Sequence, residues 1–339
     1  MGAPPPQSSD LGISPLVRGQ RRAPERDARG EREQRRRADG ERWGPPRQAL
    51  DARDALLAGS VLALSLTLAI LLVGLSLTPD RYLFVLLLPA LALRCGRRYL
   101  LDFVPFAALV LVYAESRGIA HLLHPHPHYL PQLRLEKLIF GGRVPTVVLQ
   151  DSLWSGSRRW YDTLLLYVAH INAIVPTTFA FILWLRRRAL FYRFAATMLA
   201  LSFAAALTFW LYPAAPPWAA ARDGLVSLTK IGGEHPATSS AATSGRSLHG
   251  LIQGNPYAAI PSLHAGYAFL IFLFAATLAW RTRWRWLIVF PAALYAGVQL
   301  FAAVYTGNHY VVDVLIGFGY AAASLLAVSW FWRRMSWPT

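Results

Sequence analysis

The stretch PSLHAGYAFLIFLFAATLAWRTRWRWLIVFPAALYAGVQLFAAVYTGNHYVVD, residues 261–313, decides the fold class of this chain. The patch PSLH (261–264) opens it and the patch HYVVD (309–313) closes it. Between them lie two apolar runs of about 20 residues, the length at which a helix spans a bilayer. The chain therefore crosses the membrane and returns, so both patches are predicted to lie at the same membrane face.

The rest of the chain continues this pattern. Hydrophobic residues make up 55% of the sequence and charged residues only 15%, and the apolar runs are too many and too long for a soluble fold. The formal net charge of +16 comes mostly from arginines that flank the apolar runs. Membrane topology and anionic lipid explain arginines in these places, so we expect membrane lipids as partners and no nucleic acid. The single cysteine, Cys95, allows no internal disulfide.

We predict an all-α fold, a polytopic bundle of transmembrane helices. The expected spans are 55–78, 82–94, 99–116, 160–185, 189–212, 261–280, 286–305 and 309–332. With these eight spans, all the arginine clusters between the spans fall on one side together with the amino tail. Cytoplasmic loops carry the excess of Lys and Arg, so both termini are predicted to be cytoplasmic in a plasma-membrane protein. The two histidine-bearing patches then lie on the extracytoplasmic face.

The composition divides the chain into four parts. We expect a disordered, Arg-rich tail at 1–53, a transmembrane hairpin at 54–98, a catalytic membrane domain at 99–333 and a short tail at 334–339. The outward connection 117–159 carries apolar patches typical of an amphipathic helix in the interface. The Ser/Thr/Gly-rich segment 224–250 is predicted to be a flexible loop.

The two patches carry groups suited to phosphoryl transfer. His309 and Asp313 are four residues apart and therefore share one helical face, where the carboxylate can orient the imidazole. Pro261 is suited to a first helical turn, and Ser262 or the free amides beside it can hold an anion. A phosphate placed there would lie between His309 as nucleophile and His264 as acid and base. This scheme needs no metal and no cofactor. The alternative for the His/Asp pair is a structural interhelical hydrogen bond.

These motifs resemble signatures of a known family. Pro261-Ser262-Leu263-His264 followed by His309-x-x-x-Asp313 resembles the second and third motifs of the type 2 phosphatidic acid phosphatase superfamily. Residues 255–264, 305–310 and 212–218 are most similar to its inositolphosphotransferase branch, which includes fungal inositol phosphorylceramide synthase. The resemblance covers about residues 100–333 and implies a six-helix core with additional N-terminal spans. It also implies that His309 is the nucleophile, Asp313 its orienter and His264 the acid/base.

The departures from the family pattern favour a transferase over a phosphatase. The Lys-x6-Arg-Pro signature of the phosphatases is missing. Lys137 and Arg143 resemble it only in part, because five residues separate them and they lie far before the Pro261 motif. Ala302 and Ala303 stand where a Ser-Arg pair is expected, and Leu263 stands where phosphatases commonly carry Gly. The inositolphosphotransferase branch shares these differences.

A phosphate site still needs positive charge. The predicted outer side offers Arg117, Arg143 and Arg222, each of which is explained equally well as an interfacial arginine. His170, inside the fourth span, is predicted either to hydrogen-bond in the core or to contact a substrate headgroup. Dense imidazoles can bind metal, but an interfacial loop is the expected state of the histidine tract His121, His124, His126 and His128.

The sequence thus predicts a membrane enzyme that moves a phosphoryl or phospho-alcohol group between lipids. A lipid phosphate phosphatase, acting on phosphatidate or a prenyl phosphate with water as acceptor, is the alternative within the same class. A non-catalytic transporter or lipid-binding protein, with the His and Asp side chains lining a polar pathway, is the alternative from another class. Nothing in the pattern fixes the donor, the acceptor or the oligomeric state.

Overall fold

The computed structural model describes residues 52–73, 79–123, 127–232, 255, 257–280 and 282–335, together with Gly2. The chain divides into the units Met1–Ala49 and Leu50–Thr339, and the second contains all the described residues except Gly2. The predicted disordered tail and most of the predicted loop 224–250 lie outside the described residues. His124 and His126 of the histidine tract also lie outside them.

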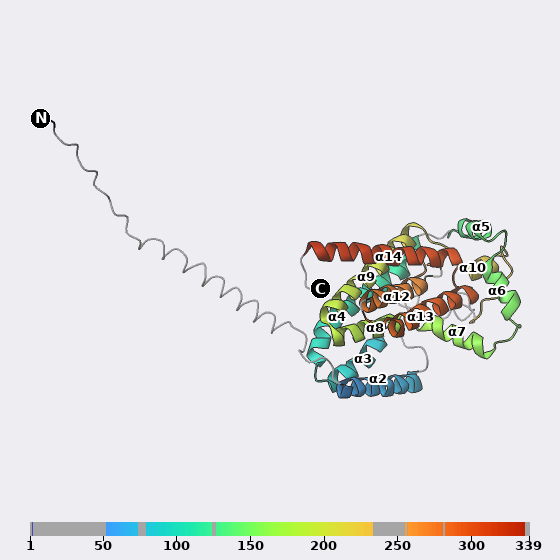
Figure 1. Cartoon of the computed structure of the whole chain (residues 1–339). Coiled ribbons are helices and arrows are strands. Elements are labelled where there is room, and N and C mark those ends of the chain that lie inside the picture. Colours follow the sequence, from blue (N-terminus) through green and yellow to red (C-terminus); the bar gives the residue numbers. More distant parts are fainter. Residues whose placement is uncertain are drawn as a thin grey trace. The chain divides into compact units, whose positions relative to one another are not determined.

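The described part of the chain is helical, which confirms the predicted fold class (Figure 1). Its only β interactions are isolated bridges that join His128 to Ala214 and Ala214 to Ala258. The helices are α2 (Ala52–Val73), α3 (Pro79–Ala92), α4 (Gly96–Leu123), α5 (Leu130–Ile139), α6 (Pro145–Leu153), α7 (Trp160–His170), α8 (Ile174–Arg186), α9 (Arg188–Leu211), α10 (Pro217–Arg222), α12 (Leu263–Ala279), α13 (Arg285–Tyr305) and α14 (Val311–Arg334).

Several of these helices are long and apolar enough to cross a membrane. Within the described residues four helices meet this criterion: Gly96–Ala120, Arg188–Leu211, Arg285–Tyr305 and Val311–Arg334. The bent pair α7 and α8 would make a fifth span, and two shorter apolar helices, Tyr82–Ala92 and Leu263–Ala279, accompany them. The protein is therefore a multi-pass membrane protein, while the full set of eight spans stays a prediction.

The fourth predicted span, 160–185, is not one continuous helix. It is broken between His170 and Ile174 into α7 and α8, which are bent by 53° relative to each other. Pro176 explains the position of the break, because it has no N–H to donate to the carbonyl four residues earlier. The break places His170 and Asn172 at a corner of the bundle.

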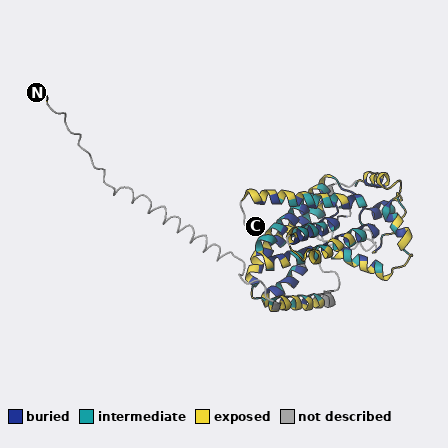
Figure 2. Ribbon diagram, in the orientation of Figure 1, coloured by how far each residue is buried: buried dark blue, intermediate teal, exposed yellow. Residues whose placement is uncertain are grey.

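The hydrophobic core runs along the middle of the bundle, where α9 buries Phe191, Phe194, Leu201 and Phe209 (Figure 2). One polar cluster is embedded at the end where α4 and α9 begin. Asp102 is 5% exposed and accepts hydrogen bonds from Trp184 Nε1 at 2.6 Å and Arg188 Nε at 2.8 Å. A buried carboxylate needs such partners, so this cluster fixes α4 against α8 and α9.

Two glycines bring α12 and α14 unusually close together. A Cβ atom on Gly317 would lie 2.3 Å from the carbonyl oxygen of Ser262, and one on Gly266 would lie 3.4 Å from the oxygen of Gly317. The amide of Ser262 also donates to the backbone oxygen of Asp313 at 3.0 Å. These contacts fix the first turn of α12 against the first turns of α14, which are the turns that carry the two sequence patches.

Candidate active site

The two histidines of the sequence patches meet at the junction of α12 and α14. His264 lies in the first turn of α12, and His309 lies in the turn between α13 and α14. Nδ1 of His264 is 3.0 Å from Nε2 of His309, within hydrogen-bond distance. His309 is 5% exposed, whereas His264 is half-buried. The crossing and return of the chain therefore bring both imidazoles to one place.

The hydrogen-bond partners define how protons are arranged on this pair. Nδ1 of His309 lies 3.0 Å from the carbonyl oxygen of Ala259, which can only accept, so Nδ1 carries the proton. Burial lowers the pKa of His309, so its ring is neutral near pH 7. Nε2 of His309 then has a free lone pair, and Nδ1 of His264 donates its proton to it.

A short set of backbone pairings places the Ala259 carbonyl. The amide of Ala214 donates to Tyr257 O at 2.9 Å, and the amide of Ala259 donates to Ala214 O at 3.3 Å. On the other side of the same segment, Ala215 N donates to His128 O at 2.9 Å. The Tyr-Pro-Ala-Ala-Pro-Pro-Trp segment, 212–218, is thus the support on which the partner of His309 rests.

Asp313 lies directly behind His309 and is completely buried. Its Oδ2 is 3.7 Å from Nδ1 of His309 and accepts a hydrogen bond from Tyr310 N at 2.9 Å. The shorter contact of His309 Nδ1 therefore goes to the Ala259 carbonyl. In this structure Asp313 caps the first turn of α14 and places its carboxyl group beside the imidazole of His309.

A second acidic residue, which sequence reasoning missed, supports the same turn. Glu136 of α5 is 0% exposed, and its two carboxylate oxygens accept hydrogen bonds from Val311 N and Val312 N at 3.2 Å each. Burial raises the pKa of this carboxyl, and the two amides oppose that shift. Glu136 satisfies amides that the start of α14 leaves open, so it fixes the position of the residues just after His309.

The turn before His309 is held from a second direction. Gly307 has a φ of 77°, a left-handed conformation that favours glycine. Its carbonyl accepts from Trp218 N at 3.1 Å. Gln150 Nε2 donates to Tyr305 O at 2.8 Å and also to Thr229 O at 2.8 Å. The loops before α12 and the end of α13 are thereby joined next to the histidine pair.

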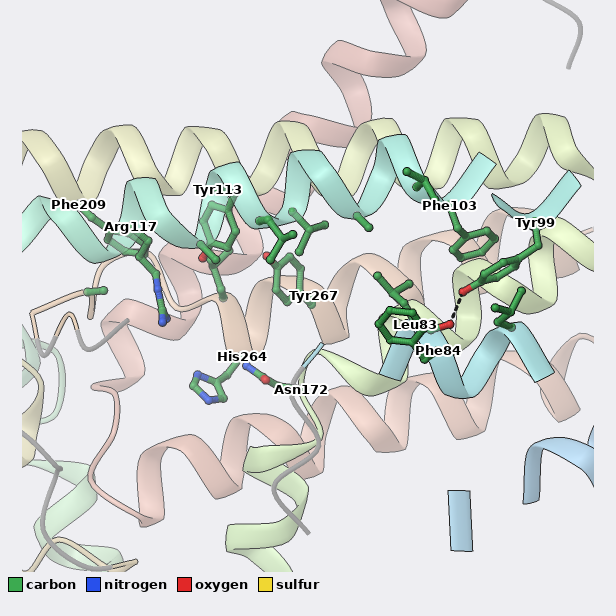
Figure 3. A pocket seen from close by; sticks show the side chains of 18 of the residues that line it. Leu83, Phe84, Tyr99, Phe103, Tyr113, Arg117, Asn172, Phe209, His264 and Tyr267 are labelled. Carbon is green, nitrogen blue, oxygen red and sulfur yellow. Dashed lines mark hydrogen bonds between the residues drawn. The ribbon is translucent and has the colours of Figure 1, made fainter. Parts of the chain in front are cut away.

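A cavity of about 480 Å³ opens onto the histidines. Both His264 and His309 line it, as do Arg117 near the end of α4 and Asn172 at the corner between α7 and α8. Figure 3 shows the guanidinium group of Arg117 directed from α4 into the space beside His264. Arg117 is thus the predicted phosphate-binding arginine that the structure places at this cavity.

The other predicted binding residues lie elsewhere. Ser262 is fully buried and caps α12, its oxygen accepting from Ala265 N. Arg222 forms an exposed ion pair with Asp223 at 3.0 Å, and Arg143 lines a separate depression between α5 and α6. His170 ends α7, two residues before Asn172. A substrate-binding role for these four residues stays a prediction.

The histidine tract is expected to be an interfacial loop, with a metal site as the alternative. Two of its four members lie outside the described residues, and His128 stacks on the ring of Tyr212 with centroids 4.3 Å apart. Within the part of the chain that the structure describes, no group of three or more His, Cys, Asp or Glu side chains is arranged to hold a metal ion.

Both histidines lie in a part of the chain that is similar to a known protein family. The family model of the PAP2 superfamily matches residues 147–327, the part that contains both histidines. The chain is also similar to a phosphoinositol dihydroceramide synthase of Bacteroides thetaiotaomicron, with 30% identity over 149 residues. That match covers 42% of this chain and 47% of the relative, so the chain spans about half the length of the relative it matches. No solved structure matches the chain.

Proposed function

Because the chain belongs to the PAP2 superfamily, we propose that it transfers a phospho-alcohol headgroup between lipids through a phosphohistidine on His309. The family and the matched synthase support an enzyme that carries out phosphoryl transfer or hydrolysis on lipid phosphates. The finer proposal rests on one observation, the contact of His264 Nδ1 with a His309 ring whose other nitrogen faces the carbonyl of Ala259. In that arrangement the Nε2 lone pair of His309, the proposed nucleophile, points toward Nδ1 of His264, the proposed proton donor.

In the first half of the proposed reaction, a lipid phosphodiester binds between the two rings in place of their hydrogen bond. The negative phosphate favours the doubly protonated form of His264. The Nε2 lone pair of His309 forms a bond to phosphorus, the bond from phosphorus to the lipid oxygen breaks, and that oxygen takes the Nδ1 proton of His264. The products are a released lipid alcohol and a phosphorylated His309.

In the second half, the neutral His264 acts as a base. Its Nδ1 accepts the proton of an acceptor hydroxyl, whose oxygen forms the new bond to phosphorus while the bond to His309 breaks. Arg117, which lines the same cavity, supplies positive charge to the phosphate in both halves. Asp313 and the Ala259 carbonyl keep the His309 ring in the reactive tautomer. No step calls on a metal ion.

We further propose phosphoinositol as the transferred group and a ceramide-like alcohol as the acceptor, following the name of the matched synthase. We place the site on the extracytoplasmic face. Two observations support that side: α4 starts beside Arg97 and Arg98 and reaches the site at Arg117, and α14 starts at the site and ends at Arg333 and Arg334. The basic ends of these helices are thus opposite to the site.

The test separates the roles of the two histidines. Purified protein is incubated with a phosphate-labelled lipid donor, and base-stable, acid-labile label on the protein is measured. Wild type is expected to become labelled, and His309→Ala is expected not to. His264→Ala is expected to be slow with a lipid donor but to recover with a p-nitrophenyl ester of the same phosphate, whose leaving group needs no proton. Labelling of His309→Ala at the wild-type level would contradict the mechanism.

The same assay distinguishes a transferase from a phosphatase. Phosphatidylinositol, phosphatidylglycerol, phosphatidate and a prenyl phosphate are supplied with and without a ceramide acceptor. A transferase is expected to move the headgroup to the acceptor, whereas release of inorganic phosphate at the same rate without acceptor would identify a phosphatase. A folded protein that turns over none of these lipids would refute the proposed function.

A further inference from the structure

The cavity beside the histidines extends far beyond the space that the reaction needs. It continues along α4 and α3 to Tyr99 and Phe103, and most of its lining is apolar. Figure 3 shows His264, Arg117 and Asn172 at one end and Tyr99, Phe103 and Leu83 at the other. Neither α3 nor α4 belongs to the part of the chain matched by the family model, residues 147–327. These N-terminal helices therefore add a wall of their own to the site.

One face of α4 leaves room for this cavity. Phe103, Ala107, Val110, Ala114 and Arg117 all line it and follow one another at intervals of three or four residues, which places them on one side of the helix. The two alanines have no side chain beyond Cβ, so the middle of the face is hollow. The ring of Tyr99 closes the far end, stacked on Phe103 with centroids 4.4 Å apart and bonded through its hydroxyl to Leu83 O at 2.7 Å.

The dimensions of the cavity fit an extended chain. A helix rises about 1.5 Å per residue, so the cavity follows α4 for roughly 27 Å from Arg117 to Tyr99. That length is close to the hydrocarbon thickness of a bilayer, about 30 Å. A volume of about 480 Å³ spread over this length leaves a narrow slot. A protein helix, about 10 Å wide, would not fit in it.

The side of the slot is open. Phe84, Leu100, Val104 and Leu111 line it, yet they are 71%, 48%, 56% and 50% exposed. In a membrane-spanning bundle, exposed apolar residues at this depth face the lipid chains. An occupant can therefore enter sideways from the bilayer while its polar end stays at the histidines.

We propose that this slot binds one hydrocarbon chain of the lipid whose phosphate reacts at His309, and that Ala107 determines which chain lengths are accepted. The occupant follows from the lining: the charged or ionisable groups that can hold a phosphate, Arg117, His264 and His309, stand at the reacting end, and the rest of the lining is mainly apolar. The ligand is therefore an amphiphile with its phosphate at that end. The proposal rests on the proposed function and adds to it the part of the substrate that α3 and α4 recognise.

The test places the aromatic ring of a phenylalanine halfway along the slot, at position 107, so that the ring blocks a long hydrocarbon chain. Ala107→Phe is compared with Val112→Phe, a change at a position on the same helix that is 57% exposed and does not line the cavity. Turnover is measured with lipids that carry either sixteen-carbon or six-carbon chains. One series varies the donor with a fixed acceptor, and a second varies the acceptor with a fixed donor.

We expect Ala107→Phe to lower kcat/KM for long-chain lipids by about tenfold or more and to leave short-chain lipids within about twofold. Val112→Phe is expected to resemble wild type with both. The series that shows the effect identifies the occupant as donor or acceptor. Equal effects on long and short chains, or the same loss in both variants, would overturn the proposal.

A second measurement does not depend on turnover or on the folding of the Ala107 variant. A phospholipid with a photoreactive diazirine at the end of its chain is crosslinked to the purified His309→Ala protein, and the labelled peptides are identified. Label on residues 79–104 supports the slot, and label confined to other helices refutes it. Labelling of this region without turnover of any lipid by wild type would refute the proposed function and leave the chain-binding slot in place.

Discussion

Substitution of Gly317 by alanine is expected to impair catalysis without unfolding the protein. The new Cβ would lie 2.3 Å from the carbonyl oxygen of Ser262, and ordinary contacts begin at 3.4 Å. One helix must therefore retreat by about 1.1 Å, because the opposing atom belongs to the backbone and cannot rotate away. A retreat of this size stretches the 3.0 Å hydrogen bond from Ser262 N to Asp313 O beyond its normal range.

The same movement separates the two turns that carry the proposed catalytic histidines, since His264 follows Ser262 on α12 and His309 precedes α14. A misplacement of about 1 Å in a reacting group costs on the order of 100-fold in rate, or about 2.7 kcal/mol of transition-state stabilisation. We therefore expect kcat of Gly317→Ala to fall about 100-fold. Overpacking costs about 1–3 kcal/mol of stability, offset in part by the higher helix propensity of alanine.

The matched control is Gly319→Ala, the same substitution two residues later on the same helix. No atom lies within 4 Å of a Cβ placed there, so this variant is expected to keep the wild-type rate. Lipid turnover of both variants is measured beside their thermal unfolding in detergent. Wild-type kcat in Gly317→Ala, or an equal loss in Gly319→Ala, would refute the idea that close packing of α12 on α14 aligns the site.

Two further predictions concern groups away from the histidines. Asp102→Ala removes the buried carboxylate that pairs with Arg188, whose side chain is 12% exposed. The variant should lower the free energy of unfolding by about 3–5 kcal/mol, because the arginine charge stays buried without its partner. A loss below about 1 kcal/mol in thermal or denaturant unfolding would contradict the structural role of this cluster. Burial lowers the pKa of Lys230, whose amine lies 4.2 Å from the centre of the Trp218 ring, to about 8. The amine is then half neutral at about pH 8, so its rate of acylation should rise in a transition centred near that pH. Trp218→Ala should move the midpoint toward the ordinary lysine value near about 10.4, and an unchanged midpoint would argue against burial by the indole.

The parts of the fold that could be predicted from the sequence are those fixed by local pattern. The apolar runs predicted where most of the long helices lie, because a membrane requires every backbone group to bond inside its own helix. The largest difference in length is at α4, which continues to Leu123, beyond the predicted end at residue 116. The two runs between the patches also predicted that His264 and His309 approach each other. The bend at residues 171–173 is not predicted although Pro176 signals it, because His170 and Asn172 are the only polar residues there and no charged residue interrupts the apolar run.

The partners of His309 could not be predicted, because they come from distant segments without a recognisable motif. The Ala259 carbonyl is a backbone group, so no residue type at this position indicates that it binds His309. Glu136 is 175 residues from the amide that it caps and lies in a short helix whose sequence is typical of an interfacial segment. Asp313 was expected to accept from His309 on helical spacing alone, but the spacing does not reveal that a carbonyl lies closer to the same nitrogen.

We propose that α4 takes the place of the cation signature that the phosphatases carry and this chain lacks. In the proposed site this helix supplies Arg117 to the phosphate and, through the face that contains Ala107, a wall to the lipid chain. Recognition of the headgroup and of the chain then depends on one rigid element, because a shift of α4 moves both. The Asp102 cluster holds the opposite end of that helix, so loss of this cluster should disturb lipid selection as well as stability. The N-terminal helices α3 and α4 thus belong to the proposed active site, although the match to the family model begins after them, at residue 147.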